Sequence, residues 1–144
     1  MILITLTMTA DQIRELYENG NEICSHTSTH HRMDNSDSPA LLEYEIVHSK
    51  AAIEAIIQHE ADVFCWCGGE EETYTSAAAE MIKKHYKFGL MTNSFPVTPD
   101  SDRFQLDRSN IEASWTMPLV RFQIAGIIDW KLRKKRDRVH RLTK

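Results

Sequence analysis

Two histidines, His26 and His30, lie four residues apart in a stretch that is otherwise rich in Ser and Thr. On a helical turn this spacing places both imidazole rings on one face, close enough to share a metal ion. Neutral imidazole suits Zn²⁺, our first choice, and also Co²⁺ or Fe²⁺, while a carboxylate from elsewhere would leave positions open for water and substrate. The neighbouring His31 would point elsewhere. Histidine pairs of this spacing also occur on helix surfaces and in loops, so spacing alone leaves both interpretations open.

Sequence signals for helices and strands alternate along the chain. Thr9 and Gln12 form a capping box at the start of a helix that Gly20 ends. Pro39 marks the first turn of a second helix, and apolar spacing predicts the remaining elements. The expected helices cover residues 9–19, 39–58, 75–86 and 118–138, and the expected strands cover residues 22–24, 62–66, 87–92 and 106–111.

This alternation predicts a parallel sheet with covering helices, in an α/β layered or barrel architecture. Functional groups of such sheets collect at the carboxyl ends of the strands. Residues 26–31 follow the first expected strand, and residues 66–72 follow the second. Both segments are therefore expected at the functional edge of the sheet.

Length and composition are those of a globular domain, since 144 residues with 42% apolar and 26% charged side chains suit one domain over residues 1–144. No apolar run is long enough to span a bilayer, and no signal peptide is visible.

The formal net charge is −4, yet residues 130–144 hold eight Lys or Arg against one Asp. We interpret this basic tail as a solvated end helix and expect no nucleic-acid partner, because it carries no recognised nucleic-acid motif.

The three cysteines are Cys24, Cys65 and Cys67. An odd count without a secretory signal argues against a disulfide framework and favours a reducing, cytoplasmic location. Cys65 and Cys67 are separated by one residue, which is too tight for a zinc knuckle.

Two stretches, residues 6–16 and 19–30, resemble the polysaccharide deacetylase (NodB homology) family. The first covers the capped helix, and the second reads Asn-Gly-Asn-Glu-Ile-Cys-Ser-His-Thr-Ser-Thr-His. The family pattern is Gly-x-Glu-Ile-x-x-His-Thr/Ser-x-x-His, so the joint match is more specific than the two histidines alone. The resemblance continues more loosely through Phe64–Gly69 and residues 87–93 to about residue 112.

The resemblance implies a distorted (β/α) barrel and a hydrolase of carbohydrate metabolism, which removes acetyl groups from N- or O-acetylated saccharides of the cell envelope or lipopolysaccharide. It implies that His26 and His30 bind a divalent metal together with an Asp. The metal would polarise the acetyl carbonyl and activate water, aided by an Asp general base. Substrate contacts are expected from residues after the second strand and from an Arg after a late strand: Trp66, Cys67, Gly68 and Arg108. A Trp beside an apolar strand is more often part of the core, and a surface ion pair is an equal alternative for Arg108.

The sequence departs from the family pattern at the catalytic residues. The family's Asp-Asp motif is missing, because residues 1–25 contain Asp11 alone and Asp11 lies in the capping box. In the family's Arg-x-Pro-Tyr motif, Cys65 replaces the Arg and Gly68 replaces the Tyr. The family's final Leu-x-His motif is also not found. No catalytic residue is therefore identifiable in this chain.

We interpret the chain as a partial (β/α) barrel of the deacetylase type that lacks its N-terminal strands, and therefore as an incomplete hydrolase. One alternative is a non-catalytic relic that binds a carbohydrate or a protein partner. Another is a plain α/β domain with a coincidental histidine pair. Without the missing strands, unpaired strand edges would need a partner or a second copy to cover them.

Overall fold

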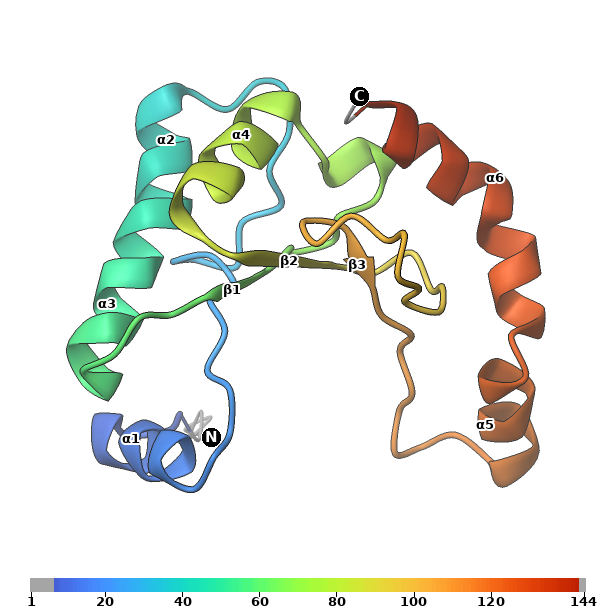
Figure 1. The fold of residues 1–144 in the computed structure, drawn as a ribbon, viewed down its shortest axis with the longest axis horizontal. Coiled ribbons are helices and arrows are strands. Elements are labelled where there is room, and N and C mark those ends of the chain that lie inside the picture. Colours follow the sequence, from blue (N-terminus) through green and yellow to red (C-terminus); the bar gives the residue numbers. More distant parts are fainter. Residues whose placement is uncertain (1–6, 143–144) are drawn as a thin grey trace, which may run out of the picture.

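The computed structural model describes residues 7–142, so residues 143 and 144 of the predicted basic tail lie outside the described part. Three parallel strands form a sheet in the order β1-β2-β3, and they cover Val63–Cys65, Phe88–Met91 and Leu106–Asp107. In register, Phe64 lies opposite Gly89 and Leu90 lies opposite Leu106. The predicted parallel sheet is present, but it is open, and a barrel is not confirmed (Figure 1).

Helices account for most of the remaining regular structure (Figure 1). The predicted capping box of Thr9 and Gln12 begins the first helix, and Ser38 caps the second ahead of Pro39. Within residues 7–142, no helix is both long and apolar enough to cross a membrane. The α-helices are α1 (Ala10–Glu18), α2 (Pro39–Glu43), α3 (Ser49–Ile57), α4 (Ser76–His85), α5 (Met117–Ile124) and α6 (Ile127–Leu142), joined by the π-helix η1 (Tyr44–His48) and the 3-10 helix η2 (Glu71–Thr73).

Four predicted elements differ from the observed ones. The strand expected at residues 106–111 is limited to Leu106–Asp107. The strand expected at residues 22–24 is reduced to a single bridge between Ser25 and Phe64. The helix expected over residues 39–58 is interrupted by η1. The helix expected over residues 118–138 is broken between α5 and α6, where Gly126 has a φ of +75° and so adopts a left-handed conformation that glycine tolerates without strain.

The π-helical turn is stabilised by hydroxyl groups from outside its own hydrogen-bond ladder. Tyr86 donates a hydrogen bond of 2.7 Å to the carbonyl of Ile46. The Ser49 hydroxyl donates to the carbonyls of Glu45 and Ile46, at 2.7 and 3.0 Å. A π-turn disturbs the regular pairing of a helix and is often found next to functional sites. Here it faces the loop that carries the two histidines.

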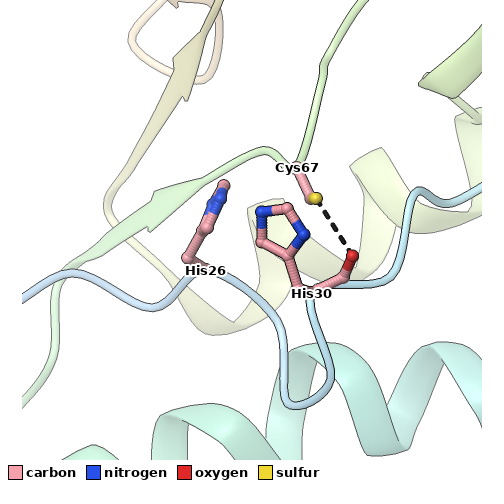
Figure 2. Close-up of side chains that lie close together, drawn as sticks. All are labelled: His26, His30 and Cys67. Atoms are coloured by element: carbon pink, nitrogen blue, oxygen red, sulfur yellow. Dashed lines mark hydrogen bonds between the residues drawn. The ribbon is translucent and has the colours of Figure 1, made fainter. Parts of the chain in front are cut away.

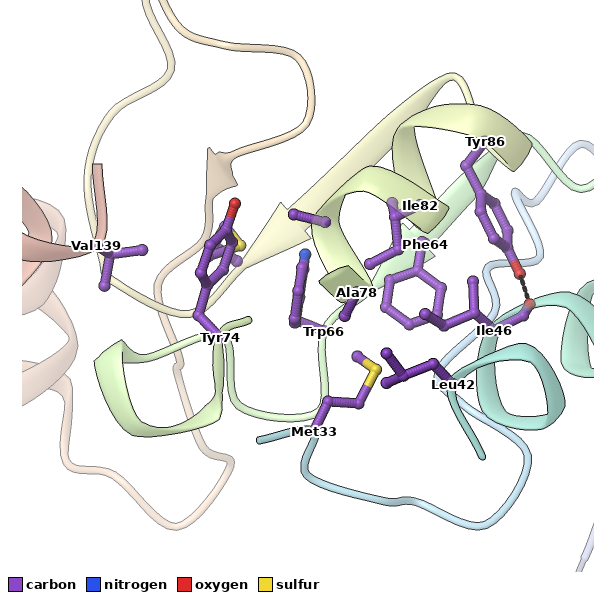
Figure 3. Close-up of a cluster of buried hydrophobic side chains, with 12 residues drawn as sticks. Met33, Leu42, Ile46, Phe64, Trp66, Tyr74, Ala78, Ile82, Tyr86 and Val139 are labelled. Carbon is purple, nitrogen blue, oxygen red and sulfur yellow. Dashed lines mark hydrogen bonds between the residues drawn. The ribbon is translucent and has the colours of Figure 1, made fainter. Parts of the chain in front are cut away.

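The hydrophobic core lies between the sheet and the layer formed by α2, η1 and α4 (Figure 3). Phe64 on β1 is its centre, with edge-on ring contacts to Trp66 and Tyr86 at 6.0 and 5.2 Å. Leu42 and Ile82 pack against it from the helices. Because this core holds the end of β1 rigidly, the residues that follow β1 have a fixed position.

The basic C-terminal segment is helical, as predicted, but the expectation that it is solvated is wrong in part, because Arg136 and Val139 are buried against the body of the protein. Val139 on α6 is fully buried in the core cluster. The buried Arg136 guanidinium lies 3.9 Å from the centre of the Phe95 ring and donates to the carbonyl of Ser94 at 3.3 Å. Arg136 and Val139 therefore attach this segment to the body of the protein.

Candidate metal centre

The histidine loop is attached to the sheet at its first strand. Ser25 donates its N–H to the Val63 carbonyl at 3.0 Å, and its own carbonyl accepts the N–H of Cys65 at 2.7 Å. These two hydrogen bonds place His26 beside the carboxyl end of β1. This is the edge of the sheet at which the sequence predicts functional groups.

His26 is oriented by the backbone of β1. Its Nδ1 lies 2.8 Å from the carbonyl oxygen of Cys65. A carbonyl can only accept, so Nδ1 carries the proton and donates it, which leaves the lone pair of Nε2 free. This is the outer-shell arrangement that orients a metal-binding histidine.

The loop between the histidines is not a helical turn. Thr27 and His30 have φ angles of +67° and +62°, in the left-handed region that side chains with a Cβ rarely adopt. The Thr27 hydroxyl accepts the N–H of His31 at 3.0 Å, which closes the turn. The rings of His26 and His30 nevertheless lie side by side in an edge-to-face arrangement, with centroids 5.0 Å apart and planes at 68° (Figure 2).

The carboxylate of Glu45, on η1, holds this strained loop. It accepts the backbone N–H groups of Ser28 and Thr29 at 2.9 Å each, and the Thr29 hydroxyl at 2.7 Å. The side chain is 1% exposed. Burial raises the pKa of Glu45, but the hydrogen bonds from Thr29 and Ser28 outweigh it, so the pKa lies below its ordinary value of 4.5. The carboxylate is therefore ionised where it supports the loop.

The same π-helical region also contacts the start of the loop. The hydroxyls of Ser25 and Ser49 are 2.7 Å apart and hydrogen-bonded in the interior. Ser49 directly follows η1, so the π-turn supports the loop on both sides of His26.

Cys67 approaches the two histidines from the opposite side (Figure 2). One ligand-type atom from each of His26, His30 and Cys67 can be chosen so that all three lie within 4.8 Å of one another. The thiol donates a hydrogen bond of 3.2 Å to the His30 carbonyl. Burial raises the pKa of Cys67, while the nearby Arg32 partly opposes this shift. Two imidazoles and a thiol thus meet in one place.

These residues line a cavity of about 420 Å³ at the carboxyl ends of all three strands. The structure brings together here every residue that the sequence nominates for metal or substrate binding: His26, His30, Trp66, Cys67, Gly68 and Arg108. Sequence reasoning missed five lining residues, namely Arg32, Glu70, Thr92, Ser109 and Asn110. Thr92, Ser109 and Asn110 follow predicted strands, so the strand-end rule could have found them.

Trp66 and Arg108 form the inner wall of the cavity. Trp66 is 1% exposed, and its indole stacks on Tyr74 with centroids 4.8 Å apart. Arg108 donates from Nε to the Met91 carbonyl at 3.0 Å and from Nη2 to the Trp66 carbonyl at 3.4 Å. Arg108 therefore ties the end of β2 to the loop after β1, and the sugar contacts of both residues stay predictions.

Cys65 occupies the position at which the family pattern has an Arg. A hydrogen bond from the Cys24 thiol, together with the nearby Arg108 guanidinium, lowers the pKa of Cys65 to about 7 against the effect of burial. All three cysteines are free thiols.

His31 lies apart from this cavity. Its Nε2 is 2.9 Å from a carboxylate oxygen of Asp37, and it is not among the residues that line the cavity. The prediction that His31 points elsewhere agrees with this placement.

Comparison with known proteins identifies the family. The family model for polysaccharide deacetylases matches residues 3–87, which is more than half of the chain. A Bacillus anthracis protein assigned as a polysaccharide deacetylase is 21% identical, with a TM-score of 0.64 over 86% of this chain. A Bacillus cereus polysaccharide deacetylase is 20% identical, with a TM-score of 0.66 over 85% of this chain.

At this identity the two structures show a shared fold, and the match spans 38% of the length of each of them. A search of curated proteins found no relative. The assignment of the chain to a family rests on the sequence match over residues 3–87. This range includes the capped helix, the histidine loop and the strand that ends beside it. The chain belongs to the polysaccharide deacetylase family.

Proposed function

We propose that this chain binds a divalent metal, with Zn²⁺ preferred, at His26 and His30, and that it takes part in removing acetyl groups from N- or O-acetylated saccharides. The observation that carries the proposal is the convergence of the two imidazoles at the wall of a strand-end cavity, in a chain of the polysaccharide deacetylase family. Family membership does not favour the alternative of a purely binding module.

The residues present suit such a metal. His26 donates through Nδ1 to a carbonyl and so offers the Nε2 lone pair, which is the form that divalent metals bind. A bound metal would supply Lewis-acid polarisation of the acetyl carbonyl and would lower the pKa of a water molecule. The cavity of about 420 Å³ is within the usual size range for small-ligand sites.

The chain's own polar groups can orient an acetylated sugar. Arg32 and Arg108 bring positive charge to the cavity, and Thr92, Ser109 and Asn110 bring hydrogen-bonding groups. Such groups recognise the hydroxyl and carbonyl oxygens of a saccharide. Their arrangement around the histidines supports a saccharide as the substrate class.

Hydrolysis also needs a proton acceptor, and the family's Asp-Asp motif is missing from residues 1–25. Of the residues that line the cavity, Glu70 is the only carboxylate. Its backbone is held at the start of η2, because its N–H donates to the Thr73 hydroxyl at 3.1 Å and its carbonyl accepts the Thr73 N–H at 3.0 Å. We assign the proton acceptor to Glu70, since general bases of this kind are most often His, Asp or Glu.

The test compares purified wild-type protein with His26→Ala and His31→Ala. After removal of metal with a chelator and addition of Zn²⁺, we expect wild type and His31→Ala to retain stoichiometric zinc, and His26→Ala to lose it. Acetate release from N-acetylated oligosaccharides should follow the same order. Equal zinc content in all three proteins would refute the metal site, and zinc binding without acetate release would refute the hydrolysis by this chain.

A further inference from the structure

The sulfur of Cys67 lies with the two histidine side chains in a group whose ligand-type atoms are all within 4.8 Å of one another (Figure 2). We propose that Cys67 is the third protein ligand of the metal, so that this chain holds the ion with two imidazoles and one thiolate. This inference rests on the proposed metal site at His26 and His30 and adds to it. Cys67 comes from the loop after β1, and the histidines come from the loop after Ser25.

The distances suit a metal after a small adjustment. Zinc bonds of about 2.0–2.1 Å to nitrogen and 2.3 Å to sulfur place tetrahedral ligand atoms about 3.5 Å apart. The present upper limit of 4.8 Å exceeds this by about an ångström, which side-chain rotations at His30 and Cys67 can supply. The tautomer of His26 is already set, because its Nδ1 donates to the Cys65 carbonyl and leaves the lone pair of Nε2 free.

The thiol is positioned by contacts that metal binding can replace. Its 3.2 Å hydrogen bond to the His30 carbonyl is a weak interaction for an S–H donor. Metal binding removes the thiol proton to solvent and forms a metal–sulfur bond in its place. Cys67 is 2% exposed, so the sulfur is sheltered on the protein side while the cavity remains open on the other.

The charge of this ligand set matches the one that the family resemblance implies. That set is two histidines with one Asp. A thiolate carries the same single negative charge as a carboxylate, so two histidines with Cys67 keep the charge of the family's ligand set. Three ligands also leave a fourth position for water or substrate. Sulfur is softer than oxygen and favours Zn²⁺ or Co²⁺ over Mg²⁺ or Mn²⁺.

Cobalt substitution tests the inference directly, because a thiolate bound to Co²⁺ gives a near-ultraviolet charge-transfer band. Metal-free wild type, Cys67→Ser and Cys24→Ser are titrated with Co²⁺, and circular dichroism verifies that each is folded. We expect the band in wild type and in Cys24→Ser. We expect Cys67→Ser to lack it and to bind at least about tenfold more weakly, as for other changes close to a metal.

The outcomes separate this inference from the proposed function. If wild type binds Co²⁺ without the band and Cys67→Ser binds it equally well, Cys67 is not a ligand and the two-histidine site stands. If neither wild type nor the variants bind Co²⁺, the metal site itself is refuted. If Cys67→Ser does not fold, X-ray absorption on the zinc-loaded wild type decides: a sulfur neighbour at about 2.3 Å supports the inference, and nitrogen and oxygen neighbours alone overturn it.

Discussion

The hydroxyl of Thr29 donates a hydrogen bond of 2.7 Å to the carboxylate of Glu45, which lies sixteen residues further along the chain. The other oxygen of the same carboxylate accepts the N–H groups of Ser28 and Thr29. The strained turn between His26 and His30 is therefore supported by a buried charge on the π-helix. Within residues 7–142, the hydrogen bonds of the Glu45 carboxylate go to Ser28 and Thr29 and to neither histidine ring, so we regard it as a positioning residue.

Replacing Glu45 with Gln tests this role. The amide of Gln can keep its oxygen on the two backbone N–H groups, but it removes the negative charge and turns an –NH₂ toward the Thr29 hydroxyl that now donates. We therefore expect the free energy of unfolding to fall by about 2 kcal/mol. Metal affinity should fall about 10- to 100-fold, as for other residues that orient metal ligands. Urea unfolding and Co²⁺ titration measure the two effects. The exposed Glu43→Gln on α2 is the matched control, and equal behaviour of the two variants would contradict the prediction.

Glu45 also predicts a pH dependence of stability. Burial raises its pKa, the hydrogen bonds from Thr29 and Ser28 lower it more, and the nearby His31 adds to the lowering. A carboxyl with a lowered pKa stabilises the folded state above its unfolded pKa, and this contribution is lost as the pH falls through the folded pKa. The stability difference between wild type and Glu45→Gln should therefore shrink as the pH falls from about 5 to about 3. Urea titrations at each pH measure it, and a constant difference would disprove the assignment.

The sequence predicted the position of the histidine loop well, because that position follows from strand order. Thr9 and Pro39 mark helix starts through local chemistry, and helices in the structure begin beside them. The cavity lies where parallel strands end, so Cys67 could be nominated from its place after a strand, whereas Arg108 was nominated from the family resemblance. These features depend on short-range signals and on one general rule of sheet topology.

The local shape of the site could not be predicted in the same way. The turn at Thr27 and His30 has positive φ values without glycine, and it is maintained by Glu45 from a distant part of the sequence. Hydrophobic spacing in residues 39–58 also does not reveal η1, because one extra residue in a turn leaves the apolar stripe nearly intact. The π-turn depends instead on the hydroxyl of Tyr86, forty residues away.

Tyr86→Phe tests that support. The variant keeps the ring in the core but removes the 2.7 Å hydrogen bond to the Ile46 carbonyl, so we expect a loss of about 1 kcal/mol in the free energy of unfolding. The loss should stay modest because Ser49 also donates to the same carbonyl. Tyr44→Phe, at a side chain that is 47% exposed, serves as the control. No loss at Tyr86, or the same loss at Tyr44, would count against this role of the hydroxyl.

Gly68 tests the shape of the cavity wall. Its φ is +98°, and an added Cβ would clash with the side chain of Thr73. The Thr73 hydroxyl accepts the N–H groups of Gly69 and Glu70 at 3.0 and 3.1 Å, so it cannot move without losing both. Gly68→Ala should therefore cost about 1 kcal/mol for backbone strain and about 2 kcal/mol more for the clash.

Gly20→Ala is the matched control for that variant. Gly20 has a similar φ of +85°, but nothing lies within 4 Å of an added Cβ. It should show only the backbone cost of about 1 kcal/mol. Urea unfolding of the two variants compares backbone strain alone with backbone strain plus the clash. Equal losses in the free energy of unfolding would mean that the Thr73 side chain moves aside without a cost.

Glu70 is tested by its effect on rate. Glu70→Gln keeps the size of the side chain and leaves the backbone hydrogen bonds to Thr73 in place but cannot take a proton, so we expect acetate release to slow by about 100-fold or more. Zinc content should stay unchanged, because Glu70 is not in the group formed by the two histidines and Cys67. The exposed Glu72→Gln should retain the wild-type rate. If Glu70→Gln releases acetate as fast as Glu72→Gln, the proton acceptor must come from another group, and the two-histidine metal site would be unaffected.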